Sequence, residues 1–323
     1  MRRVAVTTSG NDSPGFNACI RAVVRMALHY GWEPWGIRTG FAGLLAGDLM
    51  VLNSRSVSHI IGEGGTFLGT SMERGIDRPH GLRDMLRNLN EAGIDALVVI
   101  GDLEALRTAK ALDEAGFPTV GVPGTIENDI CGTDFTIGFD TALNTALDAL
   151  DRIRDTATAQ ERAFLIEMVG EHSGHLALMA GIAGGAEQVC IPEVPFTLEH
   201  VAEEVADAYV RGKKHCVIVV ASGARPPAAD IAEYLNANRE RTGFEVRLTV
   251  LGDIQRGGAP MAYDRFLATR LGAAAIQALH SGVSGLMVGL LDGELVNSPL
   301  AEVTECPREI DPAYYELSEL LAR

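Results

Sequence analysis

The sequence predicts an α/β protein of two domains, each built on a mostly parallel β-sheet covered by helices. Short apolar runs rich in β-branched residues alternate from end to end with longer segments of helical periodicity, the pattern typical of parallel sheets joined by helical crossovers. Several runs end directly in Gly or Ser, as strands do where they lead into a loop. The chain has 323 residues, enough for two hydrophobic cores.

The elements follow in order along the chain. Strands are expected at residues 4–8, 96–100, 119–122, 164–168, 217–221 and 248–251. A helix is expected after Pro14, and a clearer one from Phe139 to Ile153, where apolar residues spaced by three and four fall on one face. Ligands of such sheets bind at the carboxyl ends of strands, so loops 9–14, 101–105 and 123–129 are the places to seek chemistry.

The composition is that of a globular protein, and the formal net charge of −16 argues against nucleic-acid and anionic membrane surfaces. No apolar run approaches the ~20 residues of a membrane span, and the amino terminus is too short in apolar length for a signal peptide. The cysteines are scattered without CxxC spacing, which favours a reduced, cytoplasmic chain. They are Cys19, Cys131, Cys190, Cys216 and Cys306.

Loop 123–129 reads Pro-Gly-Thr-Ile-Glu-Asn-Asp and resembles the catalytic loop of the bacterial ATP-dependent 6-phosphofructokinases, Pro-Gly-Thr-Ile-Asp-Asn-Asp. Segments 8–18, 64–69, 132–142 and 250–258 extend the resemblance over almost the whole chain in the family's order. The resemblance implies two Rossmann-like domains, with nucleotide and sugar-phosphate sites at the domain cleft and effector sites at a subunit interface of a tetramer. A nucleotide-binding-type domain of residues 1–138 plus 253–305 and a sugar-phosphate-type domain of residues 139–252 plus 306–323 are expected.

The resemblance assigns catalytic roles to Thr125, Glu127 and Asp129, with Glu127 replacing the aspartate base of the family. Phosphoryl transfer depends on positioning and on charge neutralisation by magnesium and cationic donors, and one extra methylene displaces a carboxylate enough to slow it. Glu127 and Asp129 are alternatively structural groups that hold the loop through backbone hydrogen bonds.

The loop at 101–105 departs from the family pattern Gly-Gly-Asp-Gly-Ser/Thr. Leu103 stands in place of the magnesium-associated Asp and has no ligand atom for a metal. Glu104 stands where a Gly lets the polyphosphate approach, and Ala105 lacks the usual hydroxyl. The alternative is a shifted alignment of this loop, in which Asp102 takes the place of the magnesium-associated Asp.

Three further substitutions affect phosphate neutralisation. Asn11 replaces a Gly of the first phosphate loop, and Met72 replaces an Arg that contacts the nucleotide phosphates, with Arg74 or Arg78 as possible substitutes. Glu171 replaces an Arg that neutralises the transferring phosphate in the family, which reverses the charge.

On the sugar-phosphate side, Arg162, Arg247 and Arg256 match the positions that hold the 6-phosphate in the family. Asp253 replaces a His beside that phosphate, and Ser222 replaces a Glu that contacts the sugar. A phosphosugar site of altered preference is therefore expected.

The resemblance also implies an effector site for a nucleoside diphosphate such as ADP or GDP, or for phosphoenolpyruvate. Arg and Lys suit phosphate groups, but Arg21 and Arg25 are equally compatible with a solvated helix face. One arginine of that site is Ser54 here, beside Arg55. The matching residues are Arg21, Arg25, Arg154, Glu187, Arg211, Lys213 and His215.

The sequence therefore favours a catalytically impaired member of the family that binds phosphorylated effectors and fructose 6-phosphate, as a homotetramer or as a regulatory subunit in a heterotetramer with an active paralogue. The alternative is an active 6-phosphofructokinase or related phosphosugar kinase, which would require Mg and ATP; otherwise no cofactor is expected. No metal site is expected either, since His172 and His175 lack a third ligand of suitable spacing.

Overall fold

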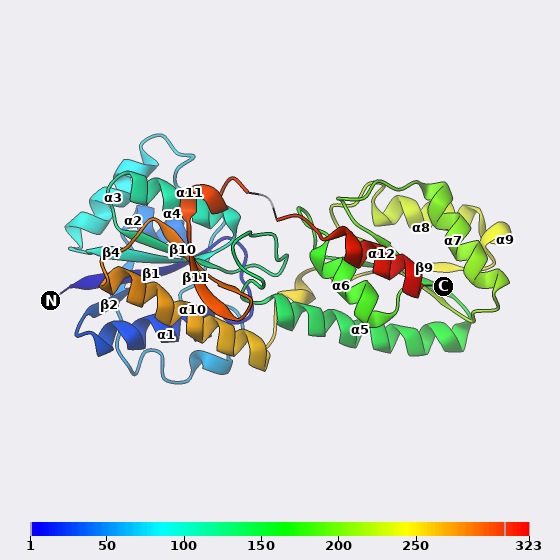
Figure 1. The fold of residues 1–323 in the computed structure, drawn as a ribbon, viewed down its shortest axis with the longest axis horizontal. Helices are drawn as coiled ribbons and strands as arrows, with labels where there is room; N and C mark the ends of the chain where they lie inside the picture. The colour runs from blue at the N-terminus through cyan, green and yellow to red at the C-terminus, as the bar shows by residue number, and fades with distance from the viewer. Residues whose placement is uncertain (1, 307, 323) are drawn as a thin grey trace. The chain divides into compact units, whose positions relative to one another are not determined.

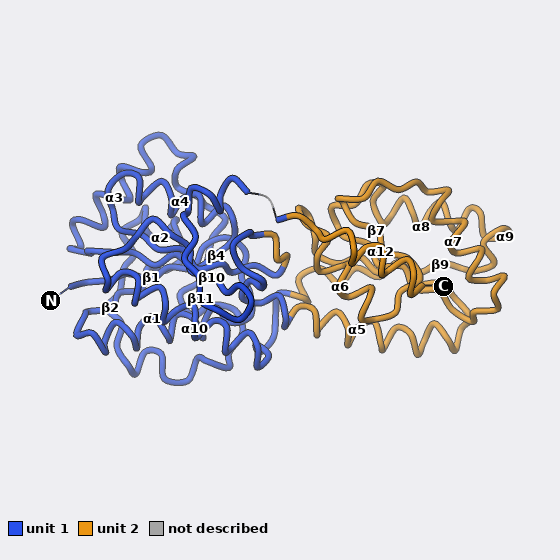
Figure 2. Tube along the Cα trace, viewed as in Figure 1, with its two compact units in different colours: residues 1–126, 130–141, 256–308 blue, residues 127–129, 142–255, 309–323 orange. Residues whose placement is uncertain are grey.

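The computed structural model describes residues 2–306 and 308–322. The chain forms two compact units (Figure 2): unit 1 contains residues 1–126, 130–141 and 256–308, and unit 2 contains residues 127–129, 142–255 and 309–323. Each unit has its own β-sheet with helices around it (Figure 1). The predicted α/β class with two mostly parallel sheets is confirmed.

The sheet of unit 1 has the strand order β11-β10-β5-β4-β1-β2-β3. Its central strands run parallel, and only the outer pairs β2–β3 and β10–β11 are antiparallel. The strands are β1 Arg3–Ser9, β2 Glu33–Ile37, β3 Leu49–Val51, β4 Ala96–Gly101, β5 Thr119–Pro123, β10 Leu286–Leu291 and β11 Glu294–Pro299.

Helices cover both faces of this sheet. Successive strand residues point to opposite faces, so Val4 and Val6 pack with α1 and α10, whereas Ala5 packs with α3 and α4. The helical segments of unit 1 are α1 Phe16–His29, α2 Gly40–Ala46, η1 Ile60–Gly62, α3 Gly81–Glu91, α4 Leu103–Glu114, α10 Ala262–His280 and α11 Leu300–Val303.

Unit 2 is built on a wholly parallel sheet of order β7-β8-β6-β9. Alternate strand residues again point to opposite faces of the sheet: Leu165 packs towards α7 and α8, and Ile166 packs towards α5 and α6. Its elements are α5 Phe139–Gln160, β6 Ala163–Met168, α6 His175–Gly184, β7 Gln188–Cys190, α7 Leu198–Val210, β8 Cys216–Ala221, α8 Ala228–Ala237, α9 Arg239–Thr242, β9 Val246–Val250, η2 Gly252–Gln255 and α12 Pro312–Leu321.

The observed units differ in detail from the predicted domains. The chain leaves one unit for the other at 141/142, 255/256 and 308/309, in each case three residues later than predicted. Residues 127–129 belong to unit 2, a detail that was not predicted from the sequence. There the side chain of Glu127 accepts a hydrogen bond from the backbone of unit 2. The last predicted strand, 248–251, corresponds to β9, which begins two residues earlier and spans Val246–Val250.

Among the helices of residues 2–306 and 308–322, none has the length and apolar character needed to cross a lipid bilayer.

Candidate functional site

The loop after β4 is organised by the carboxylate of Asp102. Asp102 is the N-cap of α4, and its Oδ1 accepts a hydrogen bond of 3.0 Å from the backbone N–H of Ala105. The backbone N–H groups of Asn11 and Glu104 donate to the same carboxylate. Burial raises the pKa of Asp102, and the nearby Glu104 carboxylate adds to the rise, while the three N–H donors oppose it.

These donors come from the two loops in which a phosphate would be sought. Backbone N–H groups at a helix N-terminus and in a glycine-containing loop form an anion site, and here a side-chain carboxylate of the same chain occupies it. The contact with the first loop is close: a Cβ added at Gly10 would overlap the carboxylate, with even the farther oxygen, Oδ1, at 2.7 Å. Gly10 also has φ +86°, so glycine is required here on both counts.

Glu104 forms two internal ion pairs. One of its oxygens lies 3.0 Å from Nη1 of Arg74, and the other is paired with Arg107. Arg78, the other proposed substitute for the missing arginine at position 72, is paired with Glu73 at 2.7 Å. Met72 itself is 65% exposed. Both candidate arginines are therefore already neutralised by carboxylates of this chain.

Met72, Arg74, Asp102 and Glu104 all line a cavity of about 230 Å³ in unit 1, together with Ser9, Gly10, Phe41 and Ala105. In the described part of the chain, no group of three or more His, Cys, Asp or Glu residues is placed to hold a metal ion. Leu103 offers no ligand atom, and Asp102 is committed to backbone donors. As arranged here, the cavity does not fit the magnesium complex of a nucleotide polyphosphate.

Loop 123–129 is held by hydrogen bonds near its start and in its middle. The N–H of Gly124 donates to the carbonyl of Gly101 (2.8 Å), and the hydroxyl of Thr136 donates to the carbonyl of Thr125 (2.6 Å). Glu127 is buried, with 8% of its surface exposed, and its Oε2 accepts from the N–H of His172 at 3.1 Å. Asn128 adopts a positive φ of 52°. The carboxylate at the position of the family's base therefore also holds the loop that follows β6.

That loop carries Glu171, whose side chain is exposed. Its backbone is closely packed, since a Cβ at Gly223 would overlap the carbonyl group of Glu171. Ser222 lies beside it, with its N–H bound to the carbonyl of Met168 at 2.9 Å. The structure thus presents a carboxylate on this loop, at the position for which the resemblance implies an arginine.

The two arginines of unit 2 that were predicted to hold a sugar phosphate, Arg162 and Arg247, converge on Glu245. Nη2 of Arg247 lies 2.7 Å from one carboxylate oxygen, and Nη2 of Arg162 lies 3.4 Å from the other. Arg239 approaches the second oxygen at 3.8 Å. Arg162 and Glu245 are neighbours because β6 and β9 pair with Ala163 opposite Val246. Three guanidinium groups around one carboxylate leave a net positive charge, which suits a further anion.

The third predicted residue of this set, Arg256, belongs to unit 1, as the first residue after the chain leaves unit 2. Asp253 lies in η2 of unit 2. The structure therefore brings together Arg162 and Arg247 but not the complete predicted set within one unit.

The predicted effector residues are likewise divided between the units. Arg21 and Arg25 are one turn apart on α1 of unit 1; burial and the positive charge of Arg25 lower the pKa of Arg21. The Nε of Arg21 is buried without a hydrogen-bond acceptor in the part of the chain described.

The remaining effector residues form two linked groups in unit 2. Lys213 donates to Glu187 (3.0 Å) and to the carbonyl of Ala322 (2.9 Å), and Glu187 also accepts from the N–H of Val217. The hydroxyl of Thr158 lies 3.0 Å from Nδ1 of His215 and donates to the carbonyl of Arg154. Arg211 is exposed at the end of α7.

Two residues central to these arrangements were not assigned from the sequence. Asp102 was considered only as a substitute metal ligand, although Asp directly before a helical segment is a common N-cap signal. Glu245 carried no signal of its own, since its contact with Arg162 depends on the pairing of two strands distant in sequence.

The fold and these loops define an α/β protein whose charged side chains gather in loops at the carboxyl ends of its strands. The family model described as "Phosphofructokinase" matches residues 3–279, and the chain belongs to the phosphofructokinase family. It is 51% identical over 323 residues to the ATP-dependent 6-phosphofructokinase 1 of Thermus thermophilus and 47% identical over 322 residues to the ATP-dependent 6-phosphofructokinase of Bacillus velezensis, with 100% of each chain covered in both comparisons.

Solved structures of the family share the fold. The phosphofructokinase of Saccharomyces cerevisiae matches all of this chain with a TM-score of 0.88 and 34% identity, and this chain spans 48% of that chain. The pyrophosphate-dependent phosphofructokinase of Marinobacter aquaeolei matches 97% of this chain and 86% of its own, with a TM-score of 0.83 and 22% identity, a likeness of fold alone.

Proposed function

We propose that this phosphofructokinase-family protein binds phosphorylated ligands but transfers phosphate poorly, and that it acts as a regulatory subunit. The observation that carries the proposal is the carboxylate of Asp102, which takes the backbone N–H donors of Asn11, Glu104 and Ala105. A nucleotide phosphate at that place would have to displace an anion that is covalently part of the chain.

The side chains expected around the transferring phosphate also support the proposal, because they supply neither a metal ligand nor a positive charge. Leu103 provides no metal ligand, and Glu171 is an acidic side chain where a cation would be needed. Loss of one preorganised donor to a transition state costs about 3–4 kcal/mol, and these losses occur together. Glu127 remains a carboxylate, but it also binds the backbone of His172.

The binding role rests on the arginines. Arg162, Arg239 and Arg247 share a single carboxylate, which favours a phosphosugar such as fructose 6-phosphate. The Nε of Arg21 is buried and has no acceptor among the residues that the structure describes, which favours an effector carrying phosphate groups. An allosteric role through a tetramer, with copies of this chain or with an active paralogue, is consistent with such retained sites.

The second candidate is an active 6-phosphofructokinase that uses ATP and magnesium. The observation in its favour is the identity of about half of all residues, over full length, with bacterial relatives that carry that name. Thr125 and Asp129 also retain the family's residue types.

A coupled assay with fructose 6-phosphate, magnesium and ATP, repeated with pyrophosphate, separates the two candidates. Turnover in the ordinary range of ~1–10³ s⁻¹ would overturn the proposal in favour of the second candidate. Absent turnover, together with calorimetric binding of fructose 6-phosphate or ADP, would support it. The variant Asp102→Gly/Leu103→Asp is expected to gain activity, and Glu91→Gln, an exposed position on α3, serves as the matched control.

The regulatory-subunit part has its own test. The chain, tagged at its native locus, is purified from its host, and its partners are identified by mass spectrometry. Recovery of a second phosphofructokinase subunit in a stable complex would support it, and recovery of homomers alone would contradict it.

A further inference from the structure

Two cysteines of unit 1 that are distant in sequence lie together in the structure. Cys131 follows the loop 123–129, and its Sγ lies 3.8 Å from the carbonyl oxygen of Val303. Cys306 is one turn further along the same segment, where its N–H donates to the carbonyl of Glu302. The two thiols are hydrogen-bonded to each other.

The surroundings give the two thiols different roles. Cys306 is exposed, whereas Cys131 is half-buried, and burial and the thiol of Cys306 raise the pKa of Cys131 to about 11. Because thiolates are the attacking species in disulfide exchange and access limits the rate, the accessible Cys306 is suited to attack first. Cys131 is then placed to displace whatever group Cys306 acquires.

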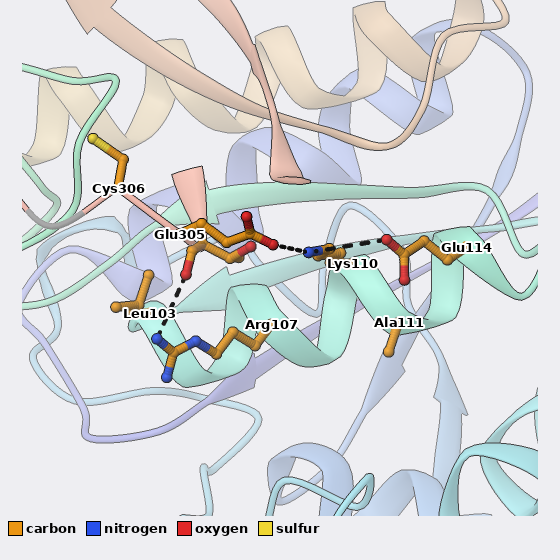
Figure 3. Close-up of a pocket in the computed structure, with 8 residues that line it drawn as sticks. Leu103, Arg107, Lys110, Ala111, Glu114, Glu305 and Cys306 are labelled. Carbon is orange, nitrogen blue, oxygen red and sulfur yellow. Dashed lines mark hydrogen bonds and ion pairs between the residues drawn. The ribbon is translucent and has the colours of Figure 1, made fainter. Parts of the chain in front are cut away.

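Cys306 also borders a cavity of about 500 Å³ on the surface of α4. Figure 3 shows this cysteine next to Glu305, with Arg107 and Lys110 projecting from the helix along the same wall. Lys110 lies between Glu305 (2.9 Å) and Glu114 (4.0 Å). A small reagent therefore has room to approach the sulfur, along a wall that carries both cationic and anionic groups.

We propose that Cys131 and Cys306 form a reversible intramolecular disulfide by exchange with a low-molecular-weight disulfide of the glutathione class. The thiolate of Cys306 attacks one sulfur of the reagent and releases one small thiol. The thiolate of Cys131 then attacks the Cys306 sulfur and releases the second. Two protein thiols lose two electrons and two protons, and the reagent disulfide is reduced to two thiols.

The position of the pair gives the bond a structural consequence. Cys131 is the second residue after the 129/130 crossing between the units, and Cys306 lies shortly before the crossing at 308/309. The disulfide would join two of the places where the chain passes between units. It would also close a long loop of the chain, and such a cross-link lowers the entropy of the unfolded state.

The test is incubation of the full chain with oxidised glutathione, followed by intact-mass analysis and peptide mapping without reductant. The expected product has lost two hydrogen atoms, carries no glutathione, yields a peptide linked through Cys131 and Cys306, melts at a higher temperature, and reverts with dithiothreitol. Cys131→Ser is expected to retain one glutathione on Cys306, and Cys306→Ser is expected to remain reduced at Cys131.

Cys190→Ser is the matched control, since Cys190 is buried in unit 2, and it should behave as the unaltered chain does. The proposal is overturned when the unaltered chain stays fully reduced, or when it keeps glutathione on Cys306 while Cys131 remains open to alkylation. None of these readouts depends on whether the protein transfers phosphate.

Discussion

The carboxylate of Asp102 lies against the α-carbon of Gly10, at a separation that leaves no room for a Cβ at position 10. The two residues follow adjacent parallel strands, since β1 and β4 pair from Val4 opposite Ala96 to Ser9 opposite Gly101. Their loops therefore meet at one edge of the sheet, where a phosphate would be bound. An internal carboxylate at this edge takes the backbone N–H donors and repels other anions.

Replacing Asp102 with serine should open this anion site without loss of helix α4. Serine is as good an N-cap as aspartate, but it carries no charge. Two unit charges about 4 Å apart repel by about 4 kcal/mol at an effective dielectric constant of ~20, and solvent in this partly open loop reduces that value. We expect the affinity for ADP, measured by calorimetry without magnesium, to rise at least about tenfold.

Glu91→Gln removes a negative charge from the exposed end of α3 and controls for the change in net charge. Equal affinities of Asp102→Ser and the unaltered chain for ADP would mean that the carboxylate does not block the site.

The packing between Gly10 and Asp102 predicts an interaction between their substitutions. Gly10→Ala places a methyl group on the carboxylate and forces φ +86° on a residue that avoids it, at about 1–2 kcal/mol for the backbone alone. We expect the free energy of unfolding to fall by about 2–4 kcal/mol. In the Asp102→Ser background the steric part should shrink, so a double-mutant cycle by urea denaturation should give a coupling of at least about 0.5 kcal/mol. Strictly additive effects would argue against the observed contact.

The arginines around Glu245 lead us to expect that replacing this glutamate strengthens the binding of fructose 6-phosphate. Glu245→Gln leaves Arg162 and Arg247 without their shared carboxylate. The ion pairs are partly exposed, so their loss should change stability by less than about 1 kcal/mol. The affinity for fructose 6-phosphate should rise about three- to tenfold by calorimetry, because the phosphate no longer competes with an internal anion. Glu240→Gln, on the exposed surface of α9, is the control, and a weaker affinity of Glu245→Gln would show that Glu245 supports the ligand instead.

The central strands could be predicted from sequence because they are fully buried and read as continuous apolar runs, as β4 (Ala96–Gly101) does. Strands β10 and β11 were missed, although β10 (Leu286–Leu291) is itself a buried apolar run. Strands β2, β3 and β7 were missed as well: β2 contains Pro34 and Gly36, and the other two have only three residues each. Such segments form strands only because a neighbouring strand offers its hydrogen bonds.

Those site residues that belong to a sequence motif could be predicted. The contacts between residues distant in the sequence could not, because they depend on the tertiary fold. Substitutions at Leu103 and Glu171 can be found from sequence, whereas the partner of Glu104 cannot. Its pairing with Arg74 depends on how a long loop returns to the N-terminus of α4. The roles of Asp102 and Glu245 as internal anions likewise arise from neighbours that the fold supplies.

The last prediction concerns Asp264, a fully buried residue in the first turn of α10 that packs against the N-terminus of α5. Its Oδ1 accepts from the N–H of Gly138 (2.8 Å), and its Oδ2 accepts from the N–H (2.7 Å) and hydroxyl (2.5 Å) of Thr141. Burial nevertheless dominates and raises the pKa of Asp264 from 3.8 to about 6. Because the folded state holds this proton more tightly than the unfolded state, the stability contributed by protonation is complete below pH 3.8 and is lost as pH rises through about 6.

Between pH 5 and pH 7 the unaltered chain should therefore lose about 1 kcal/mol of unfolding free energy relative to Asp264→Asn, in which this group does not titrate. The variant is expected to be less stable at both values, because an amide nitrogen cannot accept from the N–H of Thr141, so only the difference in pH dependence is diagnostic. Urea unfolding followed by tryptophan fluorescence reports on the correct unit, since both tryptophans, Trp32 and Trp35, lie in unit 1. Parallel pH profiles for the two proteins would mean that the carboxyl of Asp264 keeps an ordinary pKa, and that its three hydrogen bonds outweigh its burial.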